Sequence, residues 1–432
     1  MKSILKKFVP AFLLSFYHRV LALGAAWYYG FPSRRLVVIG VTGTKGKSTT
    51  VNLLSRILEE GGFKTGVSSG LNFKVAEREW LSDLKMTMPG RFRLQKLLRA
   101  MVQARCQYAI IETTSEGILQ HRHAGIWYDV LVFTNLFPEH LEAHGGFVGY
   151  KKTKLKLFEH LARLPHKKLE GKAIPKIIIA NADSEHAVDF LNFGVDKKVT
   201  FSLDSPSDFQ AQNVQIGQSG ISYQLSTTNY QLLLLGQFDV YNSLAAIATA
   251  NAFGIDLATA KRALEKVAGI PGRMELIANK HGLLIVVDYA HEPESLRQVY
   301  QTLQNWSYKN LIHVLGPTGG GRDRWRRPVM GELAAGTARY VIITTDDPYD
   351  DDPAKLANEM AAGTGGKAMI EIDRRRAIAR ALALAEPGDL VLITGKGAEQ
   401  VMAIEHNRKI PWDDRRVVQE ELLKFEARNP KS

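Results

Sequence analysis

The sequence predicts an α/β protein with a central P-loop domain built on a parallel sheet, followed by a C-terminal doubly wound, Rossmann-like domain. Three observations carry this prediction. An apolar run, Leu36–Ile39, leads into a glycine-rich turn and a Lys-Ser pair that opens a helix. Further short apolar runs alternate with amphipathic helical segments along the chain. Polar residues follow these runs, as they do at the carboxyl ends of parallel strands.

Length and composition indicate a globular protein of two or three domains. The chain has 432 residues, of which 45% are hydrophobic and 23% charged. Its single cysteine, Cys106, excludes an internal disulfide framework and suits a reducing cytoplasm. The net charge is +12. No nucleic-acid-binding motif accompanies this charge, so we expect nucleotide and phosphate ligands and no nucleic-acid partner.

Residues 1–33 form an apolar N-terminal segment that we expect to be helical. Lys2, Lys6 and Lys7 precede an apolar stretch from residue 8 to residue 31. Its longest uncharged run, Val20–Phe31, is shorter than the ~20 residues that span a bilayer. We therefore expect a helix docked on the next domain, with peripheral membrane contact through residues 8–31 as the alternative.

The glycine-rich turn after the first strand predicts a phosphate-binding loop. Glycines let backbone N–H groups converge on a polyphosphate, while Lys47 would reach the terminal phosphates and the Ser48 hydroxyl would face Mg²⁺. Five residues separate Gly40 from Gly46, where the standard motif has four, so the loop is a variant. A turn that only closes a βα unit is the alternative, and Lys-Ser at the helix start argues against it.

The rest of the central segment, 34–272, continues the α/β pattern. A helix is expected over 92–104, and strands over 108–111 and 130–134. Glu112 follows the first of these strands, where a carboxylate facing a P-loop is a natural Mg²⁺ ligand. The weakly alternating stretch 199–235 predicts a small antiparallel layer. Segment 273–432 alternates strands and helices again, as expected for a second doubly wound sheet.

Motifs spread over about 400 positions resemble those of the Mur ligase family, the ATP-dependent amide ligases of peptidoglycan synthesis. The order and spacing of the motifs carry the resemblance, which is closest to the members that add the third peptide residue. The matching segments are GVTGTKGKSTT (40–50), IETTSEGILQHR (111–122), FTNLFPEHLEAHG (133–145), YKKTKLKLF (150–158), NAD (181–183), GQFDVYNSLAAIATA (236–250), GIPGRMEL (269–276), VDYAHEPESL (287–296), GRDRWRRPVMG (321–331), TDDPYDDDP (345–353), GKGAEQ (395–400) and PWDDR (411–415).

The resemblance implies ATP and Mg²⁺ as cofactors. It assigns catalytic roles to Lys47, Lys154, His140 and Arg273, and it implies that Lys154 becomes carbamylated. The implied metal ligands are Ser48, Glu112, His140 and Lys154, with Glu139 where the family usually has Asp. The implied nucleotide contacts are Gly43, Thr44, Gly46, Lys47, Ser48, Thr49, Asn242 at the adenine, Arg273 at the phosphates, Asp288 at the ribose, and His291.

The resemblance also implies two small-molecule substrates, a UDP-muramoyl peptide and an amino acid. The implied substrate contacts are Thr87, Ser115, Arg122, Asp347, Lys396 and Glu399. The segment Asp346–Asp352 lacks the arginine with which diaminopimelate-adding relatives hold the distal carboxylate. Its aspartates at 350–352 would attract a side-chain ammonium or form a solvated helix start. Full-length relatives also have a UDP-binding domain where this sequence has 33 residues.

The implied reaction is ATP-dependent addition of a dibasic amino acid to UDP-MurNAc-L-Ala-D-Glu through an acyl phosphate. Two ligases of the same fold are alternatives: one like folylpolyglutamate synthase, and one acting on lipid-linked precursors. A non-catalytic nucleotide-binding scaffold is an alternative of another class. Lys47, Glu112, His140 and Lys154 argue against it, since a scaffold has no need of a second metal site.

Overall fold

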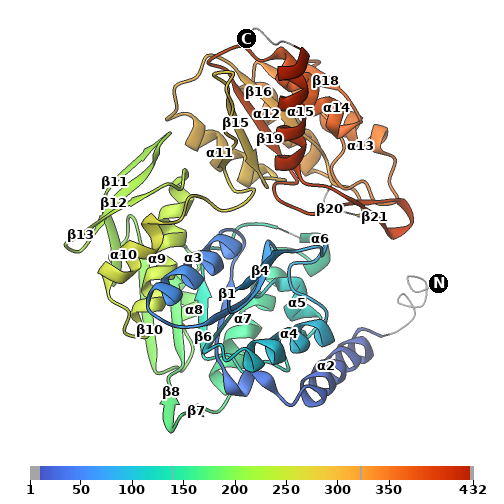
Figure 1. Ribbon diagram of the computed structural model, residues 1–432. Coiled ribbons are helices and arrows are strands. Elements are labelled where there is room, and N and C mark those ends of the chain that lie inside the picture. The colour runs from blue at the N-terminus through green and yellow to red at the C-terminus, as the bar shows by residue number, and fades with distance from the viewer. Residues whose placement is uncertain (1–9, 140, 322–323, 429–432) are drawn as a thin grey trace. The chain divides into compact units, whose positions relative to one another are not determined.

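The computed structural model describes residues 10–139, 141–321 and 324–428, and its chain divides into two compact units (Figure 1). Unit 1 comprises the chain up to Val214 with Tyr223–Tyr230 and Asp239–Lys266. Unit 2 comprises Gln215–Ser222, Gln231–Phe238 and the chain from Val267 onward. Each unit contains a largely parallel sheet with helices, which confirms the predicted α/β class.

The larger sheet has eleven strands in the order β13-β12-β11-β10-β9-β6-β1-β5-β2-β3-β4. Its six central strands, from β10 to β2, are parallel. The strand bounds are β1 (Val37–Thr42), β2 (Thr65–Ser68), β3 (Asn72–Val75), β4 (Arg78–Leu81), β5 (Tyr108–Glu112), β6 (Val130–Phe133), β9 (Ile177–Asn181), β10 (Lys197–Ser202), β11 (Phe209–Gly217), β12 (Gly220–Leu225) and β13 (Thr228–Leu232). A separate two-stranded sheet pairs β7 (Lys167–Leu169) with β8 (Lys172–Ile174).

Helices lie on both faces of this sheet (Figure 1). On one face, α4 and α7 pack on alternate residues of β1, β5, β6 and β9 in one buried apolar cluster. Helix α3 packs against β1, β2 and β5 and against α10. The bounds are α2 (Ala11–Tyr28), the 3₁₀ turn η1 (Pro32–Arg35), α3 (Lys47–Glu60), α4 (Arg91–Gln103), α5 (Ser115–Leu119), α6 (Leu141–His144), α7 (Phe147–Arg163), α8 (Ala187–Leu191), α9 (Gln237–Asn251) and α10 (Leu257–Glu265).

At β10 the structure differs from the expectation of a small antiparallel layer over 199–235. β10 joins the main sheet parallel to β9, and β11 pairs in parallel with β10 at Phe201–Phe209. The chain between β9 and β10 includes α8, so it is a crossover connection that returns a parallel strand. Weak alternation of apolar and polar residues indicates a half-buried strand, but it does not indicate which other strand pairs with it. The hairpin strands β3 and β4 were not predicted.

The sheet of unit 2 has six strands in the order β14-β15-β19-β16-β17-β18, all parallel except β14. Alternate strand residues face two buried clusters, one with α11, α12 and α13 and the other with α14 and α15. This arrangement is the predicted doubly wound sheet. The bounds are β14 (Glu275–Leu276), β15 (Leu284–Asp288), α11 (Pro293–Leu303), β16 (Leu311–Leu315), α12 (Arg326–Thr337), β17 (Tyr340–Ile343), α13 (Pro353–Ala361), η2 (Ala362–Thr364), β18 (Ala368–Ile370), α14 (Arg374–Leu384), β19 (Leu390–Thr394), β20 (Val401–Ile404), η3 (Glu405–Asn407), β21 (Arg408–Pro411) and α15 (Asp414–Arg428).

The N-terminal helix α2 contacts α4 of unit 1 (Figure 1). Ala22, Ala25 and Ala26 of α2 are buried. No helix in the described part of the chain is both long enough and apolar enough to cross a membrane.

Candidate functional site

The loop between β1 and α3 has the backbone conformation of a phosphate cradle. Gly43 has φ +151° and Gly46 has φ +79°, values that favour glycine. A Cβ at Gly43 would lie 2.0 Å from Thr134 Oγ1, and one at Gly46 would lie 2.1 Å from Asn242 Oδ1. Gly46 is also the N-cap of α3, so the helix begins at Lys47, and the Lys-Ser pair opens it as predicted. The loop thus leads directly into a helix N-terminus, where anions bind.

The register of the sheet places Glu112, a predicted metal ligand, beside this loop. Glu112, the last residue of β5, pairs with Val41 of β1. Ser48 Oγ donates a hydrogen bond to Glu112 Oε2 at 2.6 Å, and the Gly70 N–H donates to the same oxygen at 2.8 Å. Lys47 Nζ lies 3.9 Å from Glu112 Oε1. A hydroxyl and a carboxylate are therefore adjacent at the phosphate loop.

These groups fit a nucleotide with Mg²⁺. At Gly43 and Gly46 a side chain would occupy the space beside the loop backbone. The neighbouring oxygens of Ser48 and Glu112 are of the kind that Mg²⁺ prefers as ligands. Within the described residues, no three His, Cys, Asp or Glu side chains cluster as metal ligands. His140, one of the predicted ligands, lies outside the described residues. Glu139 Oε1 lies 3.5 Å from Lys45 Nζ.

Lys154 is the most unusual cation of unit 1. Its side chain extends from α7 into the interior, is 1% exposed, and donates a hydrogen bond from Nζ to the Gly43 carbonyl at 2.8 Å. Burial lowers the pKa of Lys154 well below its usual value, and the nearby Lys47 lowers it further. A lowered pKa increases the share of the neutral, nucleophilic amine over that of an ordinary lysine.

Tyr150 supports both the loop and Lys154, a role that the sequence analysis missed. Its ring lies 4.7 Å from Lys154 Nζ, and its hydroxyl lies 3.1 Å from Thr44 Oγ1. The i, i+4 spacing of Tyr150 and Lys154 on α7 places them on one helix face, which is the signal that could have identified the pair.

Thr87, Ser115 and Arg122, predicted substrate contacts, lie around the segment that precedes α4. Arg122 is buried and donates to the Met88 carbonyl and to Gln120 Oε1. Thr87 borders Gly70, whose N–H binds Glu112. Ser115 is buried at the start of α5, and a Cβ at Gly117 in that helix would lie 2.4 Å from Met88 Sδ.

Asn242 and Thr49, also predicted at the nucleotide, are both buried in unit 1. Asn242 lies beside Gly46, donates to Asp239 Oδ1 at 3.1 Å and accepts from Thr50 Oγ1 at 3.4 Å. The amide is therefore held in a fixed orientation next to the phosphate loop.

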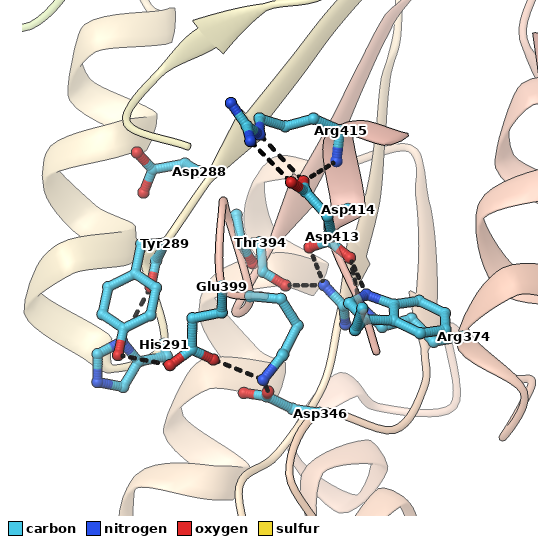
Figure 2. Close-up of polar contacts among 12 residues, drawn as sticks. Asp288, Tyr289, His291, Asp346, Arg374, Thr394, Glu399, Asp413, Asp414 and Arg415 are labelled. Carbon is cyan, nitrogen blue, oxygen red and sulfur yellow. Dashed lines mark hydrogen bonds and ion pairs between the residues drawn. The ribbon is translucent and has the colours of Figure 1, made fainter. Parts of the chain in front are cut away.

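Unit 2 has its own polar group at the carboxyl end of β15. Asp288 accepts hydrogen bonds from the N–H groups of Met274 and Ala290, each at 2.7 Å. The Arg273 guanidinium lies 4.2 Å from the centre of the Tyr289 ring. The His291 and Tyr289 rings are in edge contact at 4.6 Å (Figure 2). Tyr289, which the sequence analysis did not single out, links these predicted residues.

Lys396 is fully enclosed by carboxylates. Its ammonium lies 2.5 Å from Glu399 Oε2, 2.9 Å from Asp347 Oδ1 and 3.6 Å from Asp346 Oδ1. The Tyr289 hydroxyl lies 3.5 Å from the other oxygen of Glu399 (Figure 2). Because Lys396 has no exposed side-chain surface, it is placed to orient Glu399 and Asp347. Burial raises the pKa of Asp346.

A buried Arg374–Asp414 pair lies near this cluster and was not predicted (Figure 2). Both side chains are 0% exposed and form two hydrogen bonds, at 2.8 and 2.6 Å. Arg374 also donates to the Thr394 carbonyl at the end of β19. The two residues are 40 positions apart in the sequence, so no short motif indicates that they form a pair.

The aspartates at 350–352 each accept a backbone N–H, which favours the helix-start alternative over an ammonium pocket. Asp350 accepts from His406, Asp351 from Gly320, and Asp352 caps α13. The Tyr349 ring, next to these aspartates, lies against Gly320.

Replacing Gly46 with alanine should abolish nucleotide binding at the loop, because the new Cβ displaces Asn242 and the loop backbone. Gly62 is a matched control, since it also has positive φ (+86°) but open space around its Cβ position. We expect Gly62→Ala to cost about 1 kcal/mol of stability and to leave ATP affinity unchanged. Calorimetric titration with ATP and MgCl₂ measures the ATP affinity of both variants. If the affinity of G46A were within twofold of that of G62A, the loop would not be the phosphate-binding site.

Two family models match the chain. The Mur ligase middle domain matches residues 41–250, and the Mur ligase glutamate ligase domain matches residues 272–397. A UDP-N-acetylmuramyl-tripeptide synthetase of Roseiflexus sp. is 38% identical over 421 residues, which cover 94% of this chain and 82% of the relative.

Solved structures agree with these matches. That of a UDP-N-acetylmuramoyl-L-alanyl-D-glutamate–2,6-diaminopimelate ligase is 30% identical with a TM-score of 0.61, and the match covers 90% of this chain and 79% of that one. A Mycobacterium tuberculosis folylpolyglutamate synthase complexed with ADP and AMPPCP has a TM-score of 0.69 at 19% identity, covering 87% of this chain and 92% of that one. At that identity the likeness concerns the fold alone.

Proposed function

Because this chain belongs to the Mur ligase family, we propose that it is an ATP-dependent, ADP-forming ligase that adds an amino acid to a UDP-N-acetylmuramoyl peptide. The acceptor that we propose is UDP-MurNAc-L-Ala-D-Glu, and the added residue is a diamino acid. The observation that carries the proposal is the buried Lys154 amine beside a phosphate loop with an adjacent Ser48–Glu112 pair. Residues 34–272 and 273–432 are the proposed ATP-binding and ligase domains.

The phosphate loop and its neighbours would bind ATP and the metal. Lys47 follows the loop and would reach the terminal phosphates, while Ser48 and Glu112 would hold Mg²⁺. When bound, the metal would reduce the charge on the phosphates. In the chemistry that we propose, the acceptor carboxylate attacks the γ-phosphorus of ATP, which releases ADP and leaves an acyl phosphate. The amine of the incoming amino acid then displaces phosphate.

Lys154 would serve as a carbamate. Its neutral amine would add to CO₂, forming an N–C bond and releasing one proton, which turns a cation into an oxygen ligand for a hard metal ion. The low pKa of the buried amine supports this step, because an ammonium has no lone pair with which to attack CO₂.

Thr87, Ser115 and Arg122 are the proposed contacts of the acceptor. Among the described residues, Nε of Arg122 has no hydrogen-bond partner although it is buried. A buried guanidinium with a spare donor suits a substrate carboxylate. In unit 2, Glu399 is the proposed contact of the incoming amino group, and Lys396 and Asp347 would hold it in place.

A substrate panel tests the proposal. Purified protein is given ATP and MgCl₂ with UDP-MurNAc-L-Ala-D-Glu, a folate or a lipid-linked muramoyl peptide, each with lysine, diaminopimelate or glutamate. We expect phosphate release only with the UDP-linked acceptor and a diamino acid, with a ligated product of the corresponding mass. Phosphate release only with folate and glutamate, or only with the lipid-linked acceptor, would overturn the proposed acceptor.

A further inference from the structure

We propose that the outward face of α2 is a docking surface for an anionic lipid bilayer. This α2 face consists of eight exposed large apolar side chains: Phe12, Leu13, Phe16, Tyr17, Val20, Leu23, Trp27 and Tyr28. Phe12, Phe16 and Trp27 are 69%, 66% and 72% exposed. The proposal goes beyond the ligase function and does not depend on it.

Helical geometry makes these eight residues one continuous surface. At 3.6 residues per turn they occupy an arc of about 160°. Apart from Gly24, no other residue of α2 falls within this arc, and the charged Arg19 lies at its edge. Single exposed apolar residues are ordinary, but an apolar arc of this width on one helix marks an interaction site.

The opposite face of α2 is fixed to unit 1, so the apolar arc is held outward. Ser15 Oγ lies 2.7 Å from His121 Nε2, and Arg91 Nε donates to the His18 carbonyl at 3.1 Å. A Cβ at Gly125 would lie 2.8 Å from the Ala22 carbonyl oxygen, so the helix backbone packs closely there. An amphipathic helix on a globular domain usually buries its large apolar residues; α2 buries alanines instead.

The α2 face continues onto a basic neighbour. The rings of Tyr28 and Phe92 are in edge contact at 6.3 Å, which brings the start of α4 beside the end of α2. Lys96 and Arg99 follow Phe92 at helical spacing on α4. Neither α2 nor α4 contains an aspartate or glutamate. Within these two helices the apolar arc is therefore flanked by positive charge alone; Arg93 of α4 pairs with Asp83 outside them, at 2.9 Å.

This combination fits an anionic bilayer surface. Phe, Tyr and Trp favour the level of the lipid head groups, and nearby Lys and Arg are attracted to anionic lipids. Helix α2 has 18 residues and is not apolar enough to cross a membrane. It therefore suits a position in the membrane–water interface. A second copy of the chain is the less favoured occupant, because self-pairing of this face would bring like charges of the two α4 helices together.

Vesicle co-sedimentation of the full chain, without substrates, tests the proposal. We expect binding to vesicles of phosphatidylglycerol and phosphatidylcholine that exceeds binding to pure phosphatidylcholine at least tenfold, and that weakens with salt. The double variant Phe16→Ser/Trp27→Ser should lose at least tenfold in binding, whereas Val188→Ser, at a side chain 77% exposed elsewhere in unit 1, should bind normally. Lys96→Glu should weaken binding, and Lys198→Glu, exposed on β10, serves as its control.

Two further measurements separate the proposal from its rivals. Trp27 fluorescence should shift to shorter wavelength with anionic vesicles, and Trp27→Phe should remove that shift while the protein still binds. Equal binding of F16S/W27S and the original chain would overturn the proposal. So would a concentration-dependent dimer, seen by sedimentation velocity, that F16S/W27S abolishes. F16S/W27S should ligate a water-soluble acceptor at the same rate as the original chain. Vesicle binding is measured without substrates, so it can be interpreted even if the protein shows no ligase activity.

Discussion

Substituting methionine for Lys154 should reduce ATP-dependent amide formation by about 10²- to 10³-fold, a loss typical of removing one charge-stabilising group from an active site. Methionine fills a similar volume, so the packing around Tyr150 is preserved, but it cannot form a carbamate. Phosphate release in the presence of acceptor and amino acid measures the effect. If the variant retained the original rate, the assignment of Lys154 to the active site would be wrong.

The matched control for this substitution is Lys152→Ala, two positions away on α7 with an exposed side chain. It should leave the rate unchanged. A second readout is independent of activity: with ¹³C-labelled bicarbonate at pH 7.5, the original chain and K152A should show a carbamate carbon signal that K154M lacks. The lowered pKa of the buried Lys154 favours the neutral amine that adds to CO₂.

The family and the α/β class could be predicted because both depend on local signals. The phosphate loop, the strands that end at Glu112 and Asp288, and the order of motifs are all readable within short windows. The family matches confirm the resemblance, and the parallel sheets confirm the fold class. The roles of individual site residues stay predictions, although the structure describes where most of them lie.

What the sequence did not reveal depends on contacts between distant positions. Tyr150 was not recognised as a support for Thr44, which is 106 positions away. The stretch 199–235 was predicted as an antiparallel layer, whereas β10 at its start pairs in parallel with β9, because strand pairing is set by the crossover through α8 and not by the strand's own residues. Similarly, the resemblance implies a substrate contact for Lys396 in GKGAEQ, and only the tertiary structure shows that its side chain is enclosed by carboxylates.

Substituting methionine for Lys396 should destabilise unit 2 by about 3–5 kcal/mol, the usual effect of removing one member of a buried charge cluster. Asp346, Asp347 and Glu399 would be left without the cation that they share. Chemical denaturation followed by near-ultraviolet circular dichroism measures the free energy of unfolding. Lys355→Met, at an exposed position on α13, is the control and should change stability by less than about 0.5 kcal/mol.

The pH dependence of K396M separates an unpaired charge cluster from a simple packing defect. In the original chain, burial alone would lower the pKa of Lys396, but the three carboxylates raise it well above its usual value. Its stabilising effect is therefore complete below about pH 10.4 and is lost only as the pH rises beyond that value.

Burial raises the pKa of Asp346 and the charge of Lys396 opposes that effect, so without Lys396 the folded variant should bind a proton at Asp346 more readily than the unfolded chain does. K396M should then gain stability as the pH falls from 8 to 5, relative to the original chain. Adding Glu399→Gln should recover part of the lost stability at pH 8, because one unpaired charge is removed. A stability difference that is constant with pH and unaffected by E399Q would show that Lys396 acts through packing alone.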